Sequence, residues 1–336
     1  MTTPASNPSI YGRLRRRPEL LAAAALTLGF AVGVVLEPRL ISVGSLRSIL
    51  LWLPLVIVVA MGQTLVILSR GIDVSVGSTM GLAGMCVAML FRDHPSVNVY
   101  LGASIGVLIG GLLGTVNGCL VVLCRAPPIV ATLGTMGIYR GLTHIVSRGV
   151  QVEEYELPHA LSRWSVQGPF GQTLVPWIVV VAFVTAGLAA VLMRYTRTGR
   201  NIYAVGGNPD AARLRGVRVG AVTWMVYALC GASAGLAGTL YASRFGTVNP
   251  GSIGMGFELV VISAVVVGGI SVFGGRGSIG GVLVGCALLA TIYTSLTVLG
   301  VSPAWQSTSY GLAILAAVVL DEVLRSRAER GSRTTR

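Results

Sequence analysis

The sequence contains no lysine, because all 25 of its basic residues are arginine. A P-loop needs a lysine to reach the nucleotide phosphates, and a Schiff-base site needs a lysine amine, so this chain can build neither. Charged residues are also scarce: they make up 11% of the chain, whereas 53% is hydrophobic. A soluble domain carries about a quarter charged residues. The composition therefore predicts an integral membrane protein.

Neither the histidines nor the cysteines indicate a catalytic or metal site. The three histidines occur without an HExxH motif, which argues against an intramembrane metalloenzyme. The five cysteines are scattered among apolar runs without CxxC spacing, so we interpret them as small apolar fillers and expect no metal site. The net charge of +13 is not arranged as a basic groove with interleaved aromatic residues, so no nucleic-acid partner is expected.

Long apolar runs recur along the whole chain, each near the roughly 20 residues that a helix needs to cross a bilayer. Charges, glycines and prolines bound these runs. They predict an all-α membrane protein with ten spans near residues 19–36, 46–68, 75–91, 97–124, 128–147, 173–194, 220–243, 257–272, 279–299 and 304–324. An even number of spans places both termini on one side of the bilayer.

The arginines indicate which side that is. Arg140 lies inside a span, and six arginines lie opposite the termini, namely Arg39, Arg47, Arg92, Arg148, Arg163 and Arg244. The other eighteen lie on the side of the termini, which the positive-inside rule makes cytoplasmic. We expect cytoplasmic tails at 1–18 and 325–336 around one membrane domain, 19–324. Its two long connections are an outer loop, 148–172, and a cytoplasmic loop, 195–219.

The cytoplasmic loop contains the strongest local signal, "GGNPDAARLRG". Asn208 suits an N-cap, Pro209 the first helical position, Asp210 the positive end of a helix and Gly216 its stop. A short helix is therefore predicted, and we interpret it as a docking element instead of a solvated turn. Its small face, Ala211 and Ala212, is expected to pack against a partner.

Three further stretches each allow two interpretations. "SRGIDVSVGS", residues 69–78, is predicted to be the cytoplasmic turn between the second and third spans, where Arg70 can neutralise Asp73 and Ser75 can cap a helix; it is either a purely structural turn or one that also borders the inner gate of the path. "FGGRGSIGG", residues 273–281, follows a membrane helix, so a tight turn is favoured over phosphate binding. Glycines at every fourth position from Gly102 to Gly118 indicate close helix packing, with a pathway wall near Asn117 as the alternative.

The interpretation of three ionisable residues in the spans also stays open. Arg140 and His144 share one face of the fifth predicted helix, where they either line a wet vestibule or extend toward the outer surface. Glu258, at the expected outer start of the eighth span, has the same two interpretations.

The combination of "GQTLVILSRGIDVSVGS", "GGNPDAARLRG" and "VVVGGISVFGGRGSIGGVLVG" resembles the permease subunits of bacterial ABC importers for monosaccharides, the ribose, xylose, galactoside, rhamnose and autoinducer-2 group. The resemblance covers nearly all of residues 46–324. It implies a vitamin B12-permease-like (type II) fold in the bacterial inner membrane. It further implies a dimer of this chain or of a related permease, a cytoplasmic ABC ATPase that binds ATP and magnesium, and a periplasmic sugar-binding protein.

In such permeases the cytosolic loop helix transmits closure of the ATPase. That role falls on Gly206, Gly207, Asn208, Pro209, Asp210, Ala211, Ala212, Arg213, Leu214, Arg215 and Gly216, with Arg213 and Arg215 expected to meet carboxylates of the ATPase. The candidates for the translocation path or its gate are Gln63, Asp73, Ser75, Asn117 and Arg140. We thus expect a non-catalytic permease subunit that imports a small polyhydroxylated solute.

The alternative function is an ion-coupled secondary transporter. It would need buried carboxylates, whereas Asp73, Glu258 and Asp321 are all expected at span ends. We therefore favour the ABC permease.

Overall fold

The computed structural model describes the chain except residues 1–17, 172–174, 303–304, 307, 317–318 and 320–336. The described part is helical throughout, apart from loops and one isolated bridge between Val152 and Val248. Its long helices are α2 (Pro18–Leu36), α3 (Val43–Leu68), α4 (Val76–Asp93), α5 (Val99–Val122), α6 (Pro128–Ser147), α8 (Trp177–Tyr195), α11 (Val219–Phe245), α12 (Phe257–Val267) and α13 (Ile279–Val298). Shorter elements are η1 (Pro38–Ile41), η2 (Glu154–Glu156), α7 (His159–Val166), η3 (Pro169–Gly171), α9 (Arg197–Gly207) and α10 (Pro209–Leu214).

Nine of the ten predicted spans coincide with these nine long helices, and residues 308–316 of the tenth are helical as well. Within the described part, five helices are long and apolar enough to cross a membrane, namely α3, α5, α8, α11 and α13. Several helices begin where the sequence offers a cap. Ser42, Asn98 and Ser278 accept hydrogen bonds from backbone N–H groups in the first turns of α3, α5 and α13.

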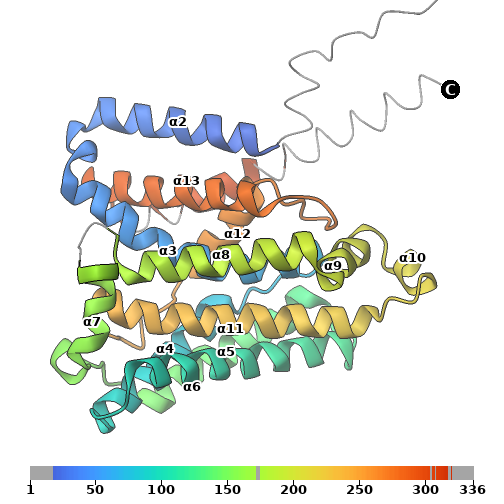
Figure 1. Cartoon of the computed structure of the whole chain (residues 1–336), viewed down its shortest axis with the longest axis horizontal. Coiled ribbons are helices and arrows are strands. Elements are labelled where there is room, and N and C mark those ends of the chain that lie inside the picture. Colours follow the sequence, from blue (N-terminus) through green and yellow to red (C-terminus); the bar gives the residue numbers. More distant parts are fainter. Residues whose placement is uncertain (1–17, 172–174, 303–304, 307, 317–318, 320–336) are drawn as a thin grey trace, which may run out of the picture.

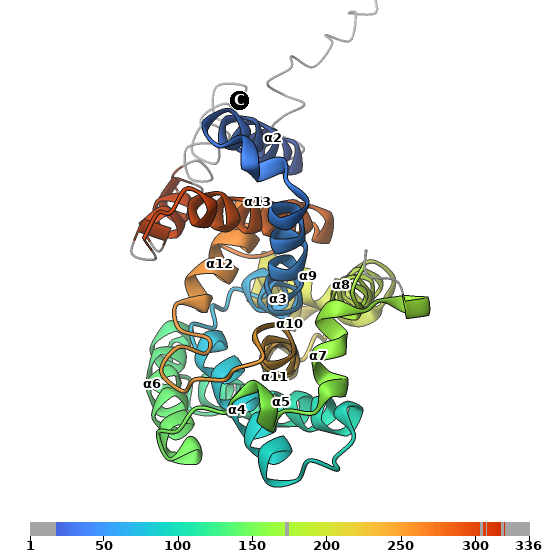
Figure 2. The ribbon, with the colours of Figure 1, turned by 90° about the vertical axis from the view of Figure 1, so that its left-hand side faces the viewer.

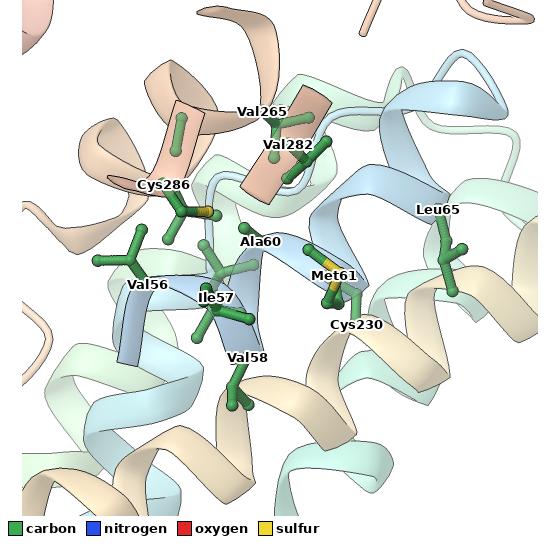
Figure 3. Close-up of a cluster of buried hydrophobic side chains, with 14 of the residues drawn as sticks. Val56, Ile57, Val58, Ala60, Met61, Leu65, Cys230, Val265, Val282 and Cys286 are labelled. Atoms are coloured by element: carbon green, nitrogen blue, oxygen red, sulfur yellow. The ribbon is translucent and has the colours of Figure 1, made fainter. Parts of the chain in front are cut away.

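The helices run roughly parallel, with α7 at one end of the bundle and α9 and α10 at the other (Figure 1). We call these the α7 end and the α10 end. Viewed from the α7 end, α3 lies between α13 on one side and α11 on the other (Figure 2). Its side chains from Leu55 to Leu68 are all buried. Figure 3 shows Val56, Ile57 and Met61 of α3 between Cys230 of α11 and Cys286 of α13. The central helix therefore organises the core.

The predicted glycine stripe packs α5 against α11. A β-carbon on Gly110 would lie 2.8 Å from the Cα of Gly235, and one on Gly114 would lie 3.0 Å from the Cα of Gly231. Backbone meets backbone along this contact, so the close-packing interpretation is confirmed. Asn117, the alternative pathway wall, is buried on the same helix.

Two connections do not stay at the ends of the bundle. Gly238 of α11 contacts the backbone of Met80 and Gly84, and it lies about 10 Å from Phe245, the last residue of α11. Val76, where α4 begins, is a further 6–12 Å or so along, close to the middle of a helix about 40 Å long. Residues 69–75 therefore return from the α10 end into the bundle. We call them the first re-entrant segment.

Residues 246–256 do the same from the α7 end. They follow α11, and Gly254 at their far end packs against the backbone of Gly77 in the first turn of α4. The starts of α4 and α12 consequently meet near mid-height, from opposite directions. The sequence predicted a turn at the cytoplasmic end of the bundle for residues 69–78 and an outer start for the eighth span at residue 257, and both positions are wrong. We call residues 246–256 the second re-entrant segment.

Residues 148–171 of the predicted outer loop are built into the bundle. They hold α7, which exchanges hydrogen bonds with Ser243 of α11: the Ser165 hydroxyl donates to the Ser243 carbonyl at 2.9 Å, and the Ser243 hydroxyl donates to the Leu161 carbonyl at 2.7 Å. Val152 pairs with Val248 of the second re-entrant segment. The loop thus anchors the start of that segment.

Candidate functional site

The predicted short helix exists as α10. The Asn208 side chain accepts hydrogen bonds from the N–H groups of Asp210 and Ala211 at 3.0 and 3.1 Å, and Pro209 occupies the first helical position. Gly216 ends the element in the left-handed region, at φ +83°. The sequence missed α9, which precedes α10 directly and is capped by Thr196.

The expectation that Ala211 and Ala212 face outward together is wrong. Ala211 is exposed, but Ala212 is only 3% exposed and packs into the hydrophobic core of this chain. Leu214, at 91% exposure, is the apolar side chain that α10 offers outward. Arg213 pairs with Asp210 of the same helix at 3.1 Å. A partner that docks on α10 would therefore contact Leu214 and the exposed Ala211, whereas Ala212 packs α10 against the core of this chain.

Three separate motifs converge at the α10 end. The Nε of Arg70 donates to the Gly206 carbonyl at 2.7 Å, and its Nη2 donates to the Gly207 carbonyl at 2.8 Å. These are the last carbonyls of α9, which have no partner within the helix. The N–H of Gly275 donates to the Leu68 carbonyl, at the end of α3, at 2.9 Å. One arginine and one glycine loop thus satisfy the ends of two helices.

This convergence, which we call the junction, leaves no free space. A β-carbon on Gly206 would overlap the Leu68 carbonyl oxygen, and Gly274 and Gly275 both have positive φ beside it. The hydroxyl of Tyr203 donates to the Gly277 carbonyl at 2.9 Å. Burial raises the pKa of Tyr203, so this donor stays protonated. The glycine-rich stretch forms a tight turn up to Ser278, where α13 begins, as favoured from the sequence.

Arg70 does not neutralise Asp73, contrary to expectation. Its φ of +69° turns the side chain toward α9. Asp73 lies in the first re-entrant segment, 1% exposed, where its carboxylate accepts from the N–H and hydroxyl of Ser75 at 2.9 and 2.7 Å. The amide of Asn117 donates to the same carboxylate at 3.2 Å and to the Ser75 hydroxyl at 2.7 Å.

Two neighbours extend this buried polar network. Tyr139 of α6 donates to the Asn117 side-chain oxygen at 3.3 Å, and the hydroxyl of Thr132 accepts from the Val74 N–H at 3.2 Å. The network therefore joins the first re-entrant segment to α5 and α6. Among the described residues, Asp73 has no ion-pair partner. Buried carboxylates are costly unless hydrogen-bonded, so neutral donors hold this one.

The other two path candidates lie outside this network. Gln63 is fully buried between α3 and α11, where its side-chain oxygen accepts from the Cys230 thiol at 3.4 Å and its nitrogen has no partner. Arg140 of α6 donates to the Ile253 carbonyl of the second re-entrant segment at 2.6 Å. His144, one turn further, is exposed, so the two do not act as a pair.

The depth of two carboxylates also differs from expectation. Asp73 and Glu258 stand next to helix starts, but those helices start inside the bundle. Asp321 lies outside the described residues. The argument against ion coupling from carboxylates at span ends is therefore wrong for Asp73 and Glu258.

An open pocket of about 450 Å³ lies beside α10, between α9 and the start of α11. Thr198 and Asn201 line it on one side, and Arg215 and Arg218 on the other. Together with the exposed Leu214, this hollow gives the α10 end a basic, uneven surface.

Comparisons with known proteins cover almost the whole chain. A family model described as "branched-chain amino acid transport system / permease component" matches residues 45–318. The autoinducer 2 import system permease protein LsrC of Escherichia coli O9:H4 (strain HS) is 37% identical over 322 residues, which is 95% of this chain and 91% of that protein. The protein of the same name from Salmonella paratyphi B is 35% identical over 320 residues, 95% of this chain and 90% of that protein. No solved structure matches.

Proposed function

The chain belongs to the branched-chain amino acid transport system / permease component family, and from this premise we propose its solute class, its partners and its mode of coupling. It is a permease subunit of an ABC importer. The proposed solute is a monosaccharide or a similar small, neutral, polyhydroxylated molecule, since the relatives at 35–37% identity are named for import of autoinducer 2.

The proposed assembly contains two permease subunits, a cytoplasmic ABC ATPase that binds ATP and magnesium, and a periplasmic sugar-binding protein. The permease itself is not the ATPase, since a chain without lysine has no P-loop. The bundle has ten spans in a type II importer fold in the inner membrane. Both termini and the α10 end face the cytoplasm, in agreement with the arginine distribution.

The observation that carries the coupling proposal is the junction. ATPase closure acts on the exposed face of α10, and α10 follows α9 after a single residue, Asn208. The end of α9 is held by Arg70, three residues before Asp73. A shift of α10 is therefore transmitted through Arg70 to the first re-entrant segment, and from there to Asn117 and Tyr139. This network forms the inner gate of the path.

Uptake by proteoliposomes tests the function. The complex is purified through a tag on this chain together with its co-purifying subunits, and radiolabelled ribose and autoinducer 2 serve as probes. We expect uptake to require ATP in the vesicle lumen, on the side that the ATPase faces. Uptake should persist when a protonophore removes the proton gradient. Uptake that proceeds without ATP and stops with the protonophore would refute the proposal in favour of an ion-coupled transporter.

A further inference from the structure

A carboxylate lies where the two re-entrant segments meet. Glu258 belongs to the first turn of α12, and its Oε2 approaches Gly77 in the first turn of α4 so closely that a β-carbon there would overlap it. The Gly254 carbonyl packs against the same glycine. Since α4 begins near the middle of α11, Glu258 lies near the middle of the bundle.

A cation reaches the same level from a third element. Arg140 of α6 donates to the Ile253 carbonyl at 2.6 Å, and its guanidinium lies beside Gly81, one turn beyond Gly77. Arg140 and Glu258, both described in full, reach the same level of the bundle without forming a direct ion pair. The two groups therefore keep separate hydrogen-bonding capacity.

The surface next to these charges is not covered by the rest of the chain. Met255 is 75% exposed and Leu259 is 40% exposed, while a β-carbon on Gly256 would meet nothing within 4 Å. Both Arg140 and Glu258 are half-buried beneath this surface. Charged side chains at mid-membrane depth are costly against lipid, and they face a bundle interior or a water-filled cavity. The exposed parts of Arg140 and Glu258 therefore need polar surroundings in place of lipid.

We propose that Arg140 and Glu258 form a solute-contact site halfway along the translocation path, suited to a neutral polyhydroxylated molecule. The carboxylate of Glu258 accepts hydrogen bonds from solute hydroxyls, and the free N–H groups of Arg140 donate to hydroxyl oxygens. Opposed half-helices that begin near the membrane centre are a known way to present polar groups to a substrate in mid-membrane. The identity of the solute rests on the proposed function, whereas the wet face does not.

Water accessibility tests the face without any solute. In a background with its five cysteines replaced, Met255→Cys is compared with Leu112→Cys. Leu112 is 65% exposed and sits on α5 between Gly110 and Gly114, which pack against the middle of α11. A charged methanethiosulfonate reagent attacks thiolates, which form in water. We expect Met255→Cys to react and Leu112→Cys, at the same depth but facing lipid, to stay unmodified. Equal reactivity of the two would overturn the proposal.

Uptake tests the solute contact. Glu258→Gln keeps the shape of the side chain beside Gly77 but removes its charge, so the KM for probe uptake should rise about tenfold, the effect of weakening a hydrogen bond to a charged group. ATP hydrolysis should stay within about twofold of wild type, and Glu258→Asp should restore part of the KM. An unchanged KM in Glu258→Gln contradicts the proposal. If the wild-type complex moves no probe, the proposed function fails, and the cysteine experiment alone decides whether this face is wet.

Discussion

Replacing Arg70 by glycine separates coupling from folding. The side chain makes two hydrogen bonds to the end of α9, at 2.7 and 2.8 Å. A hydrogen bond to a charged group contributes about 1.5–3 kcal/mol when sheltered. Arg70 is exposed, so about 1 kcal/mol for each is reasonable, with about 0.3–1 kcal/mol more from a cation at a helix C-terminus. The link between α9 and the first re-entrant segment is therefore worth about 2–3 kcal/mol.

Glycine also removes a backbone cost. Arg70 has φ +69°, a conformation that costs a residue other than glycine of order 1 kcal/mol. Relief of that strain offsets part of the free energy lost with the two hydrogen bonds to α9. The Arg70→Gly variant should therefore insert into the membrane and assemble nearly normally. With the link removed, uptake per ATP hydrolysed should fall, by at most roughly 30- to 150-fold for 2–3 kcal/mol.

The assay measures solute uptake and ATP hydrolysis by the same proteoliposomes. We expect continued hydrolysis with little uptake for Arg70→Gly. Arg70→Lys, which keeps the charge but replaces the two-pronged donor by a single ammonium group, should give an intermediate ratio. Wild-type uptake per ATP in Arg70→Gly would show that the junction does not transmit ATPase closure, and the coupling route would have to be abandoned.

Three more outcomes are expected. Gly206→Ala should abolish uptake or assembly because its β-carbon overlaps the Leu68 carbonyl, whereas Gly207→Ala, with nothing within 4 Å, should behave as wild type; equal effects in an uptake assay would contradict the packing. Single cysteines at the exposed Tyr155 and Ala211 should label from opposite sides of sealed vesicles, and labelling of both from one side would disprove the topology. The purified chain without partners should bind no ATP, as measured with a fluorescent nucleotide; saturable binding would refute this.

Much of the fold follows from composition, because an apolar run that forms a helix satisfies all of its backbone hydrogen bonds within itself. The cap at Asn208, the stop at Gly216 and the close packing of the α5 glycines are local properties, so the sequence predicts them. What could not be predicted depends on contacts far apart in the chain. The depth of Asp73 follows from where α4 meets α11, and no local pattern records that position.

The same reasoning applies to the candidate site. From the sequence, Asp73, Ser75 and Asn117 are three separate candidates for the path or its gate, and the structure joins them in one network. The role of Arg70 was assigned wrongly, since proximity in sequence favoured Asp73 while its left-handed backbone directs it to residues more than 130 positions away. Ala212 was misplaced because two adjacent alanines look alike in sequence, although successive helical residues point about 100° apart.

The backbone contact between α5 and α11 restricts how the transporter can move. Because glycines face glycines there, turning either helix about its own axis would bring a larger side chain into a contact where a β-carbon on Gly231 would already lie 2.7 Å from the Cα of Gly114. We therefore expect α5 and α11 to move together as one rigid body. Changes in backbone angle during transport must then concentrate in non-helical stretches. The two re-entrant segments would therefore act as hinges beside this rigid body, as well as connections.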